Sequence, residues 1–162
     1  MITRRTLLGT AVAAAVVSPF VLGNEALQTA MAESRLIYLT PLQSSGSESR
    51  CQAEIWYALH DGAMYVVTQA DAWRSEAIRQ GLDRARIWVG DVGNWRRADE
   101  RYRNLPVVEA TASIETDASR QEQVLASMGE KYADEWPTWG PRFRNALADG
   151  TRVMLKYQPN AA

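Results

Sequence analysis

The stretch EIWYALHDGAMYVVT, residues 54–68, decides the fold. Two apolar runs, residues 54–59 and 64–68, flank the short segment 60–63, which contains the pair Asp61-Gly62. An Asp-Gly pair between two such runs is a strong signal for a tight β-hairpin, because both central positions of the turn require a positive φ. The middle of the chain is therefore predicted to be a pair of antiparallel strands.

Further short strands are predicted on both sides of this hairpin. Residues 36–40, 85–89 and 152–157 are rich in β-branched, aromatic and other apolar side chains and are bounded by turn residues. Residues 107–115 alternate between apolar and polar side chains, which is typical of a strand with one buried face. The segment 92–102, which is rich in arginine, is expected to form a variable hairpin or loop.

Two helices interrupt the strands. The first is indicated by apolar residues at helical spacing between Trp73 and Leu82. The second is expected to open at Ser119 with a capping box that Glu122 completes, and a third, short helix is expected from Pro141 to Ala148, after an aromatic loop at 136–140. Strands do not alternate regularly with helices, so a parallel doubly wound sheet is excluded. The pattern predicts an α+β, mainly β fold: a small antiparallel split β-barrel with two to three flanking helices.

The N-terminus has the features of an export signal. Arg4-Arg5 directly precedes a weakly apolar run, residues 7–23, and Ala30-Met31-Ala32 offers a small-x-small cleavage site. This pattern predicts a twin-arginine signal peptide over residues 1–32 and a folded domain over 33–162, which would be periplasmic or extracellular after signal removal. An ordinary secretory signal is the alternative, and a signal retained as an anchor also stays open.

Composition excludes several classes of site. The chain has 18 Lys and Arg against 19 Asp and Glu, so no basic excess favours nucleic acid. Cys51 is the single cysteine and His60 the single histidine, so one chain can form neither a disulfide nor a His/Cys zinc site. No metal site and no catalytic acid, base or nucleophile is predicted.

The order of these segments resembles a known family. Residues 54–57, the Asp61-Gly62 turn, residues 64–67, a helix opening with Trp73-Arg74, and residues 87–90 follow one another as in the split β-barrel superfamily of pyridoxamine-phosphate oxidases and deazaflavin-dependent nitroreductases. The resemblance covers roughly residues 36–115. It implies a homodimer that binds FMN or a deazaflavin, with haem as the alternative cofactor.

The resemblance also implies site residues. Arg74, in the first turn of its helix, matches the basic residue that contacts the cofactor phosphate in the family, and a cation at that position suits an anion. Arg50, Ser47 and Ser49 precede the second strand and would assist, and Trp73 completes the predicted cofactor-binding set. The expected substrate pocket is walled by tryptophans, namely Trp136, Trp139 and Trp56.

These observations lead to one functional hypothesis and two alternatives. The first is an exported oxidoreductase that uses a flavin or deazaflavin to reduce a small aromatic or quinone-like substrate, with the cofactor supplying the difficult chemical step. The alternatives are a non-catalytic periplasmic binding protein for haem, flavin or another aromatic ligand, and a dimeric interaction module. The expected partners are a small-molecule ligand, the twin-arginine translocase during export and a second copy of the chain, but no nucleic acid.

Overall fold

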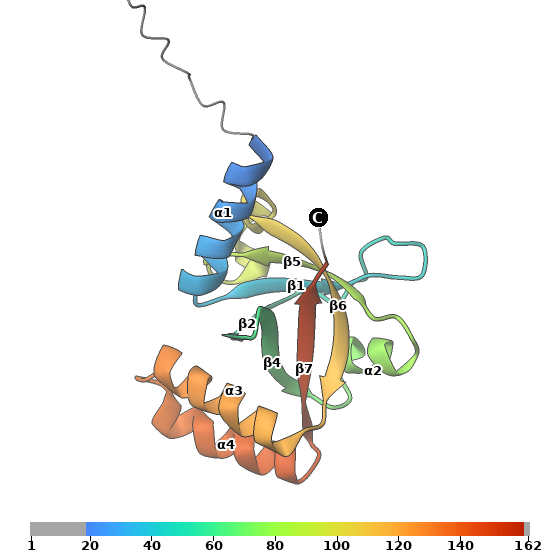
Figure 1. The fold of residues 1–162 in the computed structure, drawn as a ribbon. Helices are drawn as coiled ribbons and strands as arrows, with labels where there is room; N and C mark the ends of the chain where they lie inside the picture. Colours follow the sequence, from blue (N-terminus) through green and yellow to red (C-terminus); the bar gives the residue numbers. More distant parts are fainter. Residues whose placement is uncertain (1–18, 161–162) are drawn as a thin grey trace, which may run out of the picture.

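A computed structural model describes residues 19–160 of the 162-residue chain (Figure 1). The elements are, in chain order, α1 (Pro19–Glu33), β1 (Ile37–Pro41), β2 (Ala53–Ile55), β3 (Ala58–His60), β4 (Ala63–Gln69), α2 (Trp73–Arg79), β5 (Arg84–Val89), the 3₁₀ helices η1 (Trp95–Arg97) and η2 (Arg101–Asn104), β6 (Val107–Glu115), α3 (Ala118–Lys131), α4 (Trp136–Ala148) and β7 (Arg152–Pro159).

All strands belong to one antiparallel sheet with the order β2-β1-β5-β6-β7-β4-β3. The predicted hairpin is confirmed, because β3 pairs with β4 and Asp61 and Gly62 have φ values of 48° and 74°. The predicted strand 54–59, however, is two strands. It breaks at Trp56-Tyr57, where the chain crosses from the β1 edge of the sheet to the β4 edge. The sheet therefore curls into a split barrel, which confirms the predicted fold class.

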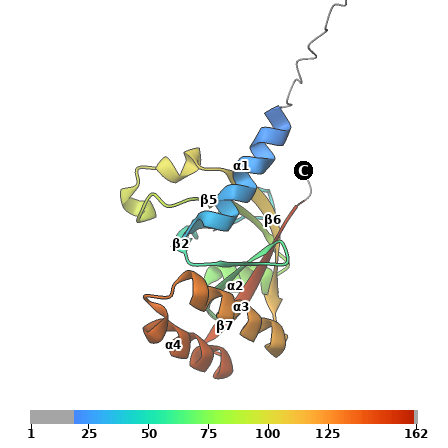
Figure 2. The ribbon, with the colours of Figure 1, turned by 60° about the vertical axis from the view of Figure 1, so that its left-hand side comes forward.

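The main core lies between the curled strands. Met64 and Val66 of β4 pack in it with inward-facing residues of the other long strands, whereas Tyr65 and Val67 belong to a second cluster outside the sheet. This alternation follows from the two-residue period of a strand. Helices α3 and α4 cover that outer face of β3, β4 and β7, so β4 is buried on both sides (Figure 2).

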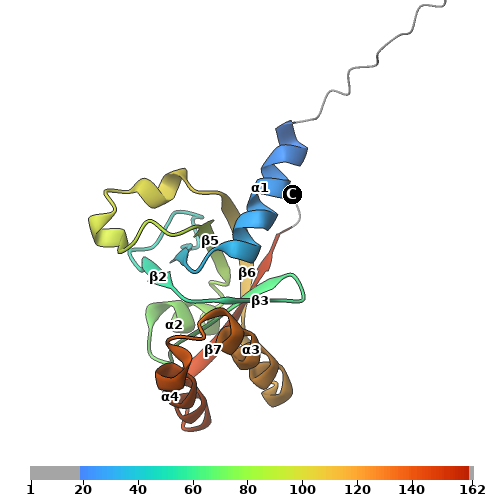
Figure 3. The same cartoon turned by 90° about the vertical axis from the view of Figure 1, so that its left-hand side faces the viewer.

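Helices α1 and α2 lie on opposite sides of the barrel, as the three ribbon views show (Figure 3). Leu27 and Ala30 of α1 and Ile78 of α2 pack against the main core, and Met31 of α1 belongs to it. A third cluster, Tyr38, Trp88 and Tyr102, lies where η2 covers the outside of β1 and β5. The predicted loop at 92–102 thus contains the 3₁₀ helix η1 and the start of η2, and aromatic packing holds it in place.

The structure corrects two local predictions about the C-terminal helices. The N-cap of α3 is Asp117, whose carboxylate accepts the N–H of Arg120, and Ser119 lies inside the helix. The predicted aromatic loop is instead the first part of α4, which begins at Trp136. A proline in the first helical turn loses no hydrogen bond there, so Pro137 is compatible with this start.

The structure describes only part of the predicted export signal. Arg4-Arg5 and residues 7–18 of the apolar run lie outside the described residues, whereas residues 19–33, including the expected cleavage site, form α1. Within residues 19–160, no helix is both long enough and apolar enough to cross a membrane.

Candidate functional site

A cavity of about 460 Å³ lies where β2 leaves the sheet, between the end of β4, the start of β7, α2 and the α3–α4 pair. Its size is in the range of pockets that hold cofactors and small ligands. The lining consists of apolar and aromatic side chains with two arginines and one carboxylate: Leu36, Glu54, Ile55, Trp56, Val67, Thr68, Gln69, Ala72, Arg74, Met128, Trp139, Phe143 and Arg152.

Two guanidinium groups reach this cavity from neighbouring elements. Arg152 opens β7 directly opposite Gln69 of β4, and Arg74, in the first turn of α2, donates to the hydroxyl of Thr68 at 3.0 Å. Both arginines therefore flank the same strand end. Among residues 19–160, neither forms an ion pair with a carboxylate. By the alternation of β4, Thr68 lies on the inner face and Gln69 on the outer face, so the two arginines approach the cavity from different faces of the strand. Each is a positive group without a counter-charge and is suited to bind an anion.

Arg74 also carries an unsatisfied donor. Its Nε is buried without a hydrogen-bond partner in the described part of the chain, and its Nη2 has only the weak acceptor Cys51 Sγ, at 3.8 Å. A buried N–H without a partner costs about 1–3 kcal/mol. The protein therefore satisfies the guanidinium only in part, mainly through Thr68.

Aromatic rings form one wall of the cavity, and Arg152 lies against it. Trp56 stacks face to face on Tyr132 with ring centroids 4.4 Å apart and an interplanar angle of 8°, and the edge of Trp139 approaches Trp56 at 6.2 Å. Phe143 lies 5.8 Å from Trp139, and the Arg152 guanidinium lies 5.6 Å from the Phe143 ring. The cavity therefore combines cationic groups with a wall of flat, apolar surface.

The break between β2 and β3 fixes Trp56 in this wall. The hydroxyl of Tyr132 accepts the N–H of Tyr57 at 3.0 Å and lies 2.9 Å from the carbonyl of Tyr57 and 2.7 Å from that of Arg35. One side chain from the end of α3 thus replaces the sheet partners that the chain lacks at the break. Burial raises the pKa of Tyr132 to about 12, so the hydroxyl stays protonated at neutral pH.

Glu54 is the single carboxylate of the lining, and it is held by the neighbouring loop. Its oxygens accept hydrogen bonds from Asn94 Nδ2 at 2.7 Å and from the N–H of Trp95 at 3.2 Å. The carboxylate thus fixes the start of η1 beside the cavity.

The structure brings together only some of the residues predicted from the sequence. Arg74, Trp56 and Trp139 line the cavity, but Trp136 does not: its indole ring packs between Gly129 and Gly140, and its centroid lies 6.0 Å from that of Phe143. Trp136 therefore supports the wall from behind.

The other predicted cofactor contacts lie outside the lining. Trp73 is 42% exposed at the start of α2, and Arg50 is exposed. Ser47 bonds to Ser45, and Ser49 accepts the N–H of Cys51. Glu48 fixes this loop by ion pairs to Arg86 and Arg103, and these arginines hold the pKa of Glu48 below its usual value.

Sequence reasoning missed Arg152 and Met128. Arg152 is one of many arginines, and only the pairing of β4 with β7 places it opposite Gln69 at the cavity. Met128 belongs to the apolar stripe of α3, whose pattern indicates burial but not which buried residues border a cavity. No local signal in the sequence distinguishes either residue.

Comparisons with known proteins identify the fold. No protein-family model and no curated protein matches the chain. Among solved structures, the chain is similar to the haem storage protein HutZ of Vibrio cholerae, with 15% identity over 84% of this chain and 89% of that one and a TM-score of 0.59. It also resembles a 5-nitroimidazole antibiotic resistance protein of Bacteroides thetaiotaomicron (8% identity, 85% and 80% covered, TM-score 0.56).

A third similar structure is a pyridoxamine 5′-phosphate oxidase of Listeria innocua, with 16% identity, 86% and 94% of the two chains covered and a TM-score of 0.51. The split barrel of this chain is therefore similar to the fold of these three proteins. At such low identity the likeness extends to the fold alone.

Proposed function

We propose that the chain binds a flat aromatic cofactor with an anionic group, of the flavin or deazaflavin type, and acts as an oxidoreductase on a small aromatic or quinone-like substrate. The observation that carries the proposal is the cavity that is lined by Arg74 and Arg152 together with Trp56, Trp139 and Phe143. FMN has this combination of a phosphate and a flat ring system. The similarity of the fold to a nitroimidazole resistance protein and to a pyridoxamine-phosphate oxidase agrees with this chemistry.

The lining residues have distinct roles in this proposal. Arg74 and Arg152 neutralise the anionic group. Trp56 and Trp139 present the aromatic surface, while Met128, Val67 and Phe143 exclude water around the ring. A bound flavin supplies hydride transfer, so the protein needs to position the reactants and keep the site dry rather than provide a nucleophile.

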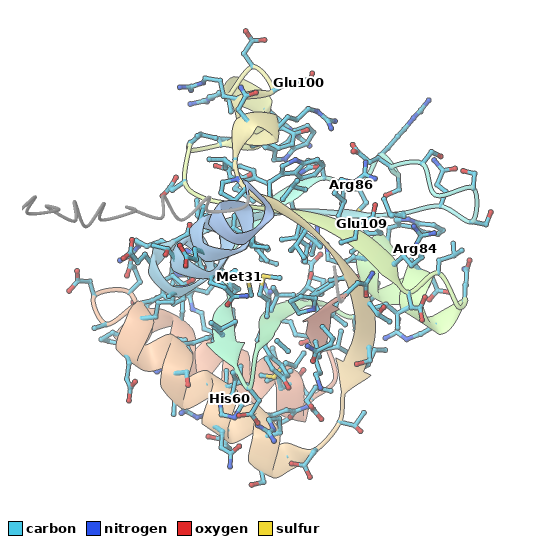
Figure 4. All side chains as sticks on the ribbon, turned by 45° about the horizontal axis from the view of Figure 1, so that its top comes forward. Met31, His60, Arg84, Arg86, Glu100 and Glu109 are labelled. Atoms are coloured by element: carbon cyan, nitrogen blue, oxygen red, sulfur yellow. The ribbon has the colours of Figure 1, made fainter. Side chains whose placement is uncertain are left out.

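Haem fits the cavity less well than a flavin does. Haem iron is held in proteins by His, Cys, Met or Tyr, and among the lining residues only Met128 offers such a ligand. His60 lies away from the cavity on the β3–β4 hairpin, with its Nε2 3.7 Å from Asp61 (Figure 4). Because HutZ is described as a haem storage protein, non-catalytic haem binding stays the alternative that an experiment must exclude.

The proposal is tested by isolating the protein from its native host and recording its visible spectrum, followed by titration with FMN, a deazaflavin and haemin. The expected result is a flavin-type absorbance, quenching of tryptophan fluorescence by the flavin, and oxidation of a reduced nicotinamide when a quinone or nitroaromatic acceptor is added. A Soret band in the isolated protein, or flavin binding without turnover, would contradict the oxidoreductase and favour a binding protein.

Substitution of the arginines tests the site itself. Arg74→Ala and Arg152→Ala should each weaken binding by about 10- to 100-fold, since a hydrogen bond to a charged group contributes about 1.5–3 kcal/mol. Arg50→Ala is the matched control, because Arg50 is exposed and outside the lining. Equal effects of Arg50→Ala and Arg74→Ala would place the site elsewhere.

Export and self-association belong to the same proposal. The pair Arg4-Arg5 and the apolar run that follows support export by the twin-arginine route, which suits a protein that folds around a cofactor before it leaves the cytoplasm. A homodimer is proposed from the resemblance to the split-barrel superfamily. Cell fractionation and light scattering of the isolated protein test these two points, and a cytoplasmic or monomeric protein would contradict them.

A further inference from the structure

Helix α1 runs across the position at which the sequence predicts signal cleavage. The bond between Ala32 and Glu33 lies in the last turn of the helix Pro19–Glu33. The N–H of Ser34 donates to the carbonyl of Ala30 at 2.9 Å, so the helical hydrogen bonding continues past this bond. The expected cleavage site is therefore part of a regular element.

The residues just before this bond belong to the main core. Met31 is 1% exposed and lies in the same cluster as Ile37 and Val89, and Leu27 and Ala30 pack against that cluster. Positions 27, 30 and 31 have the spacing of one helix face. Figure 4 shows Met31 beneath the helix, on the side that faces the barrel. Removal of residues 1–32 would take this face out of the core.

A buried hydrogen bond connects the same turn to the break in the sheet. The hydroxyl of Tyr57 donates to the carbonyl of Met31 at 2.7 Å, and Tyr57 is fully buried. Cleavage after Ala32 would leave this hydroxyl without its acceptor and would open the core beside Trp56, which lines the cavity. The end of α1 is thus joined to the segment that closes the barrel.

We propose that the protein is not cleaved after Ala32 and that the C-terminal part of α1, residues 25–33, stays in the mature chain as a permanent cover of the barrel. The mature protein then either keeps its whole N-terminal segment or begins at or before Glu25. A peptidase binds its substrate in an extended form, and here the residue two positions before the bond is buried in the folded core. The twin-arginine route carries folded proteins, so this protection would already exist at the membrane.

The substitution Ala32→Gln tests the proposal in the full chain. Ala32 is exposed, so glutamine fits there without touching the core, but it removes the small residue that cleavage after position 32 requires. Intact-mass measurement of the exported protein should give a chain that starts at or before Glu25, in the wild type and the variant alike. A mature wild-type chain that starts at any later residue, Glu33 above all, would overturn the proposal.

A second variant tests the structural role of the helix independently of processing. Met31→Ala in the full chain should lower the melting temperature by several degrees, because it removes most of a fully buried side chain. Ala32→Gln, one residue away on the exposed side, is the matched control and should leave the melting temperature unchanged. Equal melting temperatures for Met31→Ala and the wild type would show that the helix is not part of the fold and would overturn the proposal.

Discussion

Replacing Tyr132 by phenylalanine should destabilise the whole barrel, although it removes a single oxygen atom. The hydroxyl of Tyr132 occupies the break between β2 and β3 and contacts three backbone groups, at 3.0 Å from the Tyr57 nitrogen, 2.9 Å from the Tyr57 oxygen and 2.7 Å from the Arg35 oxygen. The phenylalanine ring keeps the stacking on Trp56 at 4.4 Å, so the change tests the hydrogen bonds alone.

The size of the effect follows from the groups left without partners. The N–H of Tyr57 has no other hydrogen bond in the described structure, so its loss of an acceptor costs about 1–3 kcal/mol. The single O–H can donate to one carbonyl at a time, which adds about 1 kcal/mol for the lost bond. The expected loss in the free energy of unfolding is therefore about 2–4 kcal/mol, or a fall in melting temperature of about 6–12 °C for a domain of this size.

Chemical denaturation followed by tryptophan fluorescence measures this loss. Tyr65→Phe is the matched control: Tyr65 is 2% exposed in the same outer cluster, and no hydrogen bond of its hydroxyl is present among residues 19–160. The control should change the stability by less than about 1 kcal/mol. Equal stabilities of the two variants would refute the role assigned to the Tyr132 hydroxyl.

Two further predictions concern α3 and its contacts. Gly129→Ala places a Cβ 2.7 Å from the Trp136 ring, so it should lower the free energy of unfolding by about 1 kcal/mol. In a Trp136→Ala background, Gly129→Ala should instead raise the free energy of unfolding, because alanine favours a helix over glycine by about 1 kcal/mol. If a denaturation assay gave the same change in both backgrounds, the close contact with the Trp136 ring would be contradicted. Burial and the nearby charge of Arg35 lower the pKa of Lys131 to about 8, so the unfolded chain binds more protons between about pH 8 and pH 10. The free energy of unfolding of the wild type should therefore rise between about pH 8 and pH 10 relative to that of Lys131→Met. Parallel pH profiles of the free energy of unfolding for the two proteins would contradict the buried position of the amine.

Local sequence patterns sufficed for most of the sheet. The Asp61-Gly62 pair specifies its turn through backbone conformation, and the alternation at 107–115 places Ala110 and Ala112 in the core as expected. Both signals act over a few residues, which is the reason that they can be recognised without knowledge of the fold. The same reasoning missed the break at Trp56-Tyr57, because the hydroxyl that makes it possible lies 75 residues away.

The helix α4 and half of the site depend on long-range contacts. Gly140 and Pro141 argue against a helix by local propensity, but packing of the Trp136 ring against Gly129 stabilises one. Arg74 could be chosen from its place after a strand, whereas Arg152 reaches the cavity only through the β4–β7 pairing. The sequence therefore predicted one of the two cations and two of the three aromatic residues in the wall.

The central claim is that the cavity holds an aromatic ligand whose anionic group is bound by the arginines of the lining, Arg74 and Arg152. Its most direct test is the affinity for FMN against that for riboflavin, which lacks the phosphate, measured by tryptophan fluorescence in the wild type and in Arg74→Ala. The wild type should prefer FMN by at least about 10-fold, and Arg74→Ala should lose most of that preference. Equal affinities in the wild type, or an undiminished preference in the variant, would contradict the account.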